Sequence, residues 1–100
     1  RGFLVSVGRM TLTHILEYLV EYNSEVTFMV PRYDECILGI GYRFNDGPLP
    51  IYSIERVLAV LESNGFDEEE AHKICDLKVL GGWNGPGSPI YVRESEMRTD

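Results

Sequence analysis

The chain has 100 residues, of which 44% are hydrophobic and 11% aromatic, so it has the composition of one compact domain and not of a disordered segment. Its 16 acidic and 9 basic residues give a formal net charge of -7, which disfavours direct binding to nucleic acid or to an anionic membrane and favours a basic partner. An alternative that stays open is that the acidity only maintains solubility. No apolar run approaches the roughly 20 residues of a bilayer-spanning helix, so we predict no membrane insertion.

The chain divides into three predicted parts. We interpret residues 1–9 as an upstream extension, an expression remnant or a processed end, because they precede Met10 and their apolar stretch is too short for a signal peptide. Residues 10–92 form the predicted globular domain. Residues 93–100 are polar and aperiodic, which predicts a flexible tail.

The first predicted element is a helix over about residues 11–23. Its apolar side chains recur at the spacing of one helical face: Leu12, Ile15, Leu16 and Leu19. Thr11 or Thr13 can accept a hydrogen bond from an unpaired backbone N–H at the start of this helix, and Asn23 suits its end.

Strand-forming sequences follow the first helix. Residues 26–30 are β-branched and apolar, which predicts a short strand, and residues 36–44 predict a second strand. Asn45-Asp46-Gly47-Pro48 is a strong turn signal, after which residues 49–52 can return as a hairpin strand. We expect that strand at the edge of the sheet, because Pro50 has no backbone N–H to donate.

Two further helices are predicted over about residues 53–64 and 67–76. Four carboxylates at residues 67–70 suit the N-terminus of the second of these, where the helix dipole favours negative charge. After residue 76 we expect an extended chain, and residues 89–92 predict a final strand. This order predicts an α+β fold, in which a small, mostly antiparallel sheet of three to four strands carries three helices mainly on one face.

The side chains that could support metal or thiol chemistry do not form a complete site. His72 is three residues from both Glu69 and Cys75, so successive pairs are neighbours on a helix, but all three cannot share one narrow stripe. No second cluster supplies the remaining ligands of a zinc site, so we predict no metal. Cys36 and Cys75 lie in apolar patterns, which predicts buried, reduced thiols; whether they ever pair is left open.

The glycine motifs do not indicate a nucleotide site. Gly39-Ile40-Gly41 lacks the third glycine and the following helix that a dinucleotide site needs. Residues 81–87 contain no lysine, serine or threonine placed as in a phosphate-binding loop. With no catalytic set in view, we predict no cofactor and no enzymatic activity.

The segment from residue 80 to residue 92 combines the only tryptophan with four glycines and two prolines. Tryptophan and tyrosine are enriched at interface hot spots, because they bury a large area at a low entropy cost. Aromatic residues of this segment and of the hairpin, together with acidic residues at the third helix, therefore form a predicted partner-binding site: Trp83, Asn84, Tyr42, Tyr52, Tyr91, Glu68 and Glu69. The alternative that Trp83 closes the core is left open.

Short motifs in the last two-thirds of the chain form a distinctive set: residues 34–39, residues 50–52, Glu-Glu-Ala at 69–71, Gly-Gly-Trp-Asn-Gly at 81–85 and Ser-Pro-Ile-Tyr at 88–91. The set resembles a widespread group of small phage- and prophage-encoded proteins of unassigned function. This chain departs from the group at residues 76–78 and by its additional Pro86. The resemblance implies a phage origin and a location in the host cytoplasm.

These observations lead to two functional hypotheses. The first is a phage-encoded, non-enzymatic module that binds a host or phage protein, in its sharper form as an inhibitor of a host nucleic-acid enzyme or defence system. The second is a small-molecule or nucleotide-signal binding module that acts as a homo-oligomer. Exposed strand edges in so small a sheet favour pairing between chains, which keeps a homodimer open under either hypothesis.

Overall fold

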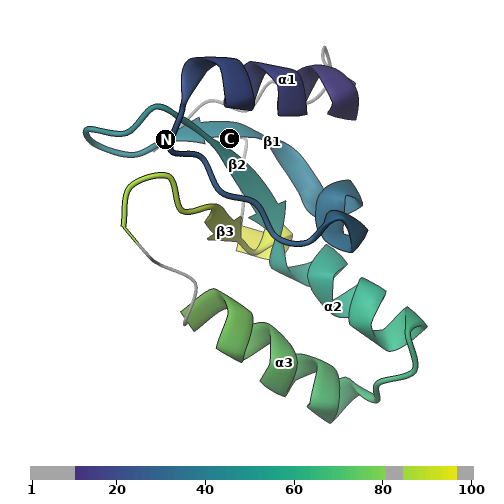
Figure 1. Ribbon diagram of the computed structural model, residues 1–100. Coiled ribbons are helices and arrows are strands. Elements are labelled where there is room, and N and C mark those ends of the chain that lie inside the picture. Colours follow the sequence, from purple (N-terminus) through teal and green to yellow (C-terminus); the bar gives the residue numbers. More distant parts are fainter. Residues whose placement is uncertain (1–10, 81–84, 97–100) are drawn as a thin grey trace.

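A computed structural model of the protein describes residues 11–80 and 85–96 (Figure 1). The helices are α1 (Leu12–Tyr22), α2 (Ile54–Ser63) and α3 (Glu68–Leu80), with short 3-10 helices η2 (Pro31–Cys36) and η3 (Glu94–Glu96). The strands are β1 (Ile37–Tyr42), β2 (Pro48–Ser53) and β3 (Ile90–Val92). The predicted α+β class is confirmed.

The strands form a mixed sheet in the order β1-β2-β3. β1 and β2 are an antiparallel hairpin, whereas β3 lies parallel to β2. Parallel neighbours need a long crossover, and here α2 and α3 supply it. The prediction of an edge position for the strand that contains Pro50 is wrong, because β2 is the central strand and all six of its residues are buried. Pro50 is tolerated there because β3 pairs only with the three residues that follow it, Ile51–Ser53.

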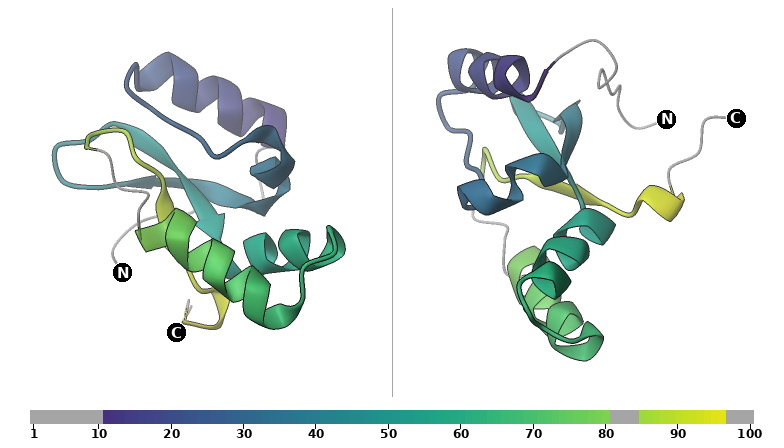
Figure 2. Two further views of the ribbon diagram at one scale, coloured as in Figure 1. Left: turned by 60° about the horizontal axis from the view of Figure 1, so that its bottom comes forward. Right: turned by 90° about the vertical axis from the view of Figure 1, so that its right-hand side faces the viewer.

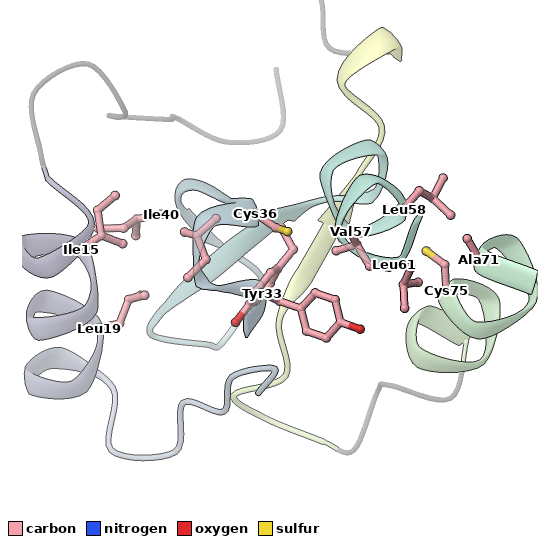
Figure 3. Packing of buried hydrophobic residues seen from close by; sticks show 12 residues of the cluster. Ile15, Leu19, Tyr33, Cys36, Ile40, Val57, Leu58, Leu61, Ala71 and Cys75 are labelled. Carbon is pink, nitrogen blue, oxygen red and sulfur yellow. The ribbon is translucent and has the colours of Figure 1, made fainter. Parts of the chain in front are cut away.

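One hydrophobic cluster joins the helices to one face of the sheet. Ile40 and Tyr52 point to that face, since Ile40 pairs with Pro50, which lies two residues before Tyr52. Figure 3 shows Ile15 and Leu19 of α1 at one end of this cluster and Cys75 of α3 towards the other. In Figures 1 and 2, α1 and α3 accordingly lie at opposite ends of the molecule, with the sheet between them.

The helices begin at the capping residues that the sequence indicates. The side-chain oxygen of Thr11 accepts a hydrogen bond from the His14 N–H at 3.2 Å. At α3 the Asp67 N–H donates to Glu70 Oε1 at 3.1 Å, and the Glu70 N–H donates to Asp67 Oδ1 at 2.8 Å. This reciprocal pair is a capping box.

The third helix is longer than predicted, because it continues beyond residue 76 to Leu80. Leu77 interrupts the apolar pattern, since its side chain is 75% exposed. No glycine or proline occurs between the start of this helix and Gly81, so nothing in residues 77–80 stops the helix once it has begun.

The strand predicted over residues 26–30 is absent, although its sequence favours one. Its backbone N–H groups form hydrogen bonds that are not part of a β-sheet. The Thr27 N–H donates to the Gly87 carbonyl at 2.9 Å, and the Met29 N–H donates to the Tyr52 hydroxyl at 3.0 Å. The segment over residues 26–30 therefore packs against the core without regular secondary structure, and we call it the core-covering segment. Pro31 then begins η2.

The first part of the predicted flexible tail is bonded to the domain, whereas residues 97–100 of that tail lie outside the described residues. Residues 94–96 form η3, and the Glu94 carboxylate accepts from the Ser53 hydroxyl at 2.5 Å and from Arg56 Nε at 3.2 Å. The Glu94 N–H in turn donates to the Glu55 carboxylate at 2.8 Å. These bonds fix the end of β3 against the start of α2.

Candidate functional site

Five of the residues in the predicted partner-binding site are described by the structure, and these five do not lie on one common surface. Trp83 and Asn84 lie outside the described residues. Tyr52 is completely buried, so it is a core residue and not a surface contact. Tyr91 is half-buried with its ring stacked on that of Tyr52, the ring centres being 5.8 Å apart. Burial holds the pKa of both hydroxyls above the usual range for tyrosine.

The two predicted acidic residues lie away from the remaining tyrosine. Glu68 and Glu69 are exposed in the first turn of α3, whereas Tyr42 ends β1 beside α1. Because α1 and α3 occupy opposite ends of the molecule (Figure 2), Glu68 and Glu69 lie at the other end from α1 and its neighbour Tyr42. Tyr42 therefore belongs to a different surface.

That surface is formed by Tyr18, Tyr22 and Tyr42, and we call it the tyrosine surface. The rings of Tyr18 and Tyr22 lie with their centres 4.6 Å apart and their planes tilted by 43°. The hydroxyl oxygens of Tyr18 and Tyr42 are 3.3 Å apart and form a hydrogen bond. Tyr22 is 60% and Tyr42 49% exposed, so the contacts among the three rings leave much of their area open to a partner.

Local sequence explains this placement. Tyr18 and Tyr22 stand one turn apart on α1, along the border of the apolar stripe that contains Ile15 and Leu19. The buried Asn23 ends the helix, and its side-chain amide donates to the Pro48 carbonyl at 3.0 Å. Since Pro48 pairs with Tyr42, this bond holds the end of α1 against the hairpin turn (Figure 1).

The charges beside the tyrosine surface are negative. α1 contains Glu17 and Glu21 and no lysine or arginine. The Glu21 carboxylate raises the pKa of the Tyr22 hydroxyl, first by a hydrogen bond and then by charge repulsion. The hydrogen bond between the Tyr18 and Tyr42 hydroxyls, followed by partial burial, raises the pKa of Tyr42. Both raised pKa values favour the neutral hydroxyl.

The described part of the glycine-rich segment has a structural role. The Gly87 N–H donates to Asp46 Oδ1 at 3.1 Å, and the Gly87 carbonyl accepts from the Thr27 N–H at 2.9 Å and from its hydroxyl at 3.2 Å. Arg43 forms a 3.6 Å ion pair with Asp46 and donates to the Ser88 carbonyl. Residues 85–89 are therefore hydrogen-bonded on one side to the hairpin turn and on the other to the core-covering segment at residues 26–30.

The residues considered for metal or thiol chemistry differ in their exposure to solvent. Cys75 is buried in the core, whereas Glu69 and His72 are exposed. Within residues 11–80 and 85–96, no group of three or more His, Cys, Asp or Glu side chains is placed to hold a metal ion. Cys36 and Cys75 are both free and buried, as predicted. Burial raises the pKa of Cys36 to about 11, which keeps it a protonated thiol.

Sequence reasoning missed Tyr18 and Tyr22. The sequence shows the two as an aromatic pair at the i, i+4 spacing beside the apolar stripe of the first helix, so their contact could have been predicted. The hydrogen bond between Tyr18 and Tyr42 could not be predicted from the sequence, because it joins residues 24 positions apart.

Comparisons with protein-family models, with curated proteins and with solved structures give no match to this chain. Among the described residues, no helix combines the length and the apolar character needed to cross a membrane.

Proposed function

We propose that this protein is a non-enzymatic binding module that docks a partner protein with a basic surface on its tyrosine surface. The observation that carries the proposal is the exposure of Tyr22 and Tyr42, each held in place through Tyr18. The phage resemblance extends the proposal to an inhibitor acting on a host protein in the host cytoplasm.

Two physical features support docking at this surface. Tyrosine buries a large area on binding and has few rotatable bonds, so ordering it costs little conformational entropy. Here the ring contact and the hydroxyl bond already order the three side chains in the free protein, which lowers that cost further. The net charge of -7 would speed the encounter with a basic partner.

A capture experiment with a matched control tests the proposal. Immobilised wild-type protein, Tyr22→Ser and Val20→Ser are exposed to a lysate of the cells that make the protein, and bound proteins are quantified by mass spectrometry. Val20 lies on the same helix and is 61% exposed, close to the 60% of Tyr22, but it lies outside the tyrosine surface. We expect a basic partner to be lost with Tyr22→Ser and retained with Val20→Ser. Equal recovery with both variants would contradict the proposal.

A further inference from the structure

The tyrosine surface has a row of carboxylates along one side, and these carboxylates favour a partner that presents a cation. Along α1 the row of Tyr18 and Tyr22 runs beside the row of Glu17 and Glu21, which is offset by one residue. Glu21 is three residues from Tyr18 and adjacent to Tyr22, so a group seated on the rings also meets a carboxylate.

The two carboxylates lack a neutralising partner in the described structure. The ion pairs found in residues 11–80 and 85–96 join Arg43 to Asp46 and Arg56 to Glu94, and neither Glu17 nor Glu21 takes part. Like charges at the i, i+4 spacing repel one another on a helix. A cation placed between them and the rings would relieve that repulsion, whereas an anion would increase it.

We propose that the tyrosine surface receives an arginine of the partner, whose guanidinium lies on the exposed ring of Tyr22 and pairs with the Glu21 carboxylate. This inference rests on the proposed function and names the chemistry of the partner segment.

Arginine fits this arrangement better than lysine. Its planar guanidinium stacks on an aromatic ring and can also donate two parallel hydrogen bonds to a carboxylate. A lysine ammonium offers a compact charge that is more strongly hydrated. A second copy of this chain fits less well, because a symmetric contact through α1 would bring the Glu17 and Glu21 carboxylates of both copies together.

The test is a titration of the full chain with a capped tetra-arginine peptide, followed by NMR of the tyrosine ring signals, with tetra-lysine as the matched peptide. We expect saturable shifts at Tyr18, Tyr22 and Tyr42, and an affinity for tetra-lysine lower by about two- to fivefold. Tyr22→Leu should abolish the shifts and Tyr22→Phe should retain them, because the interaction uses the face of the ring.

A pair of charge variants separates a local site from general attraction to an acidic protein. Glu21→Gln should weaken tetra-arginine binding by about two- to fivefold. Glu62→Gln removes one exposed carboxylate from α2 and should leave the affinity unchanged.

Three outcomes would overturn the inference: equal affinity for the two peptides, equal losses in the two charge variants, or a concentration-dependent dimer that Tyr22→Ser abolishes. A fourth outcome separates it from the proposed function. If tetra-arginine shifts no tyrosine signal while partner capture still depends on Tyr22, the arginine assignment fails and the docking surface stands.

Discussion

At the scale of single residues, Gly87 joins three parts of the chain. Its φ of +89° favours glycine, and a Cβ built on it would lie 1.9 Å from the Glu25 carbonyl oxygen. A side chain at this position would therefore have to displace backbone, and the bonds of Gly87 to Asp46 and Thr27 would be disturbed with it.

We expect Gly87→Ala to lower the free energy of unfolding by more than about 3 kcal/mol. Gly65→Ala is the matched control, since Gly65 has a φ of +102° but no atom within 4 Å of its added Cβ. That variant should lose only about 1–2 kcal/mol, from backbone strain alone. Urea denaturation of both variants measures the difference, and equal losses would show that the close contact with Glu25 is unimportant.

The buried thiol of Cys36 gives a pH dependence with a definite sign. Its pKa rises from the ordinary 9.0 to about 11 in the folded protein, so between these values the unfolded chain has lost a proton that the folded chain still holds. The contribution of Cys36 to the free energy of unfolding is therefore fully present below about pH 9 and is lost as the pH rises through about 11. Urea midpoints measured across this range should fall with pH, and they should fall less steeply in Cys36→Ala. Parallel curves for the two proteins would contradict the burial of this thiol.

At the scale of elements, the Ser53 hydroxyl links the start of α2 to the end of β3. It accepts from the Arg56 N–H at 3.2 Å and donates to the Glu94 carboxylate at 2.5 Å. Ser53→Ala should therefore cost about 2–3 kcal/mol of unfolding free energy, from the lost cap and the lost bond to a charged group. Thr11→Ala removes an exposed cap alone and should cost about 0.5–1 kcal/mol. Thermal unfolding that showed the same loss in both variants would mean that the hydrogen bond from Ser53 to Glu94 contributes nothing to stability.

The elements also show which features a sequence can predict. The apolar spacing in α1 and α2 predicted both helices, because their buried faces are set by neighbours three and four residues apart. The strand over residues 26–30 was wrongly predicted, because propensity does not reveal whether a partner strand exists. The central place of β2 depends on β3, which follows it by some 40 residues and is brought to it only by folding.

At the scale of the whole molecule, folding separates two groups of aromatic residues that are mixed along the sequence. Tyr52 is buried in the core and the half-buried Tyr91 packs against it, whereas Tyr22 and Tyr42 remain on the surface beside Tyr18. Composition predicted an acidic protein with aromatic residues available for binding, but burial decides which of them a partner can reach. The site predicted around Trp83 and Asn84 falls outside the described residues and stays a prediction.

Photo-cross-linking tests the tyrosine surface most directly. A photoreactive phenylalanine analogue replaces Tyr22 in one protein and Val20 in another, and each is irradiated in the cells that make the chain. We expect a covalent adduct to a partner protein from position 22 and none from position 20. An adduct that forms only from position 20, or equally from both positions, would contradict docking at the tyrosine surface.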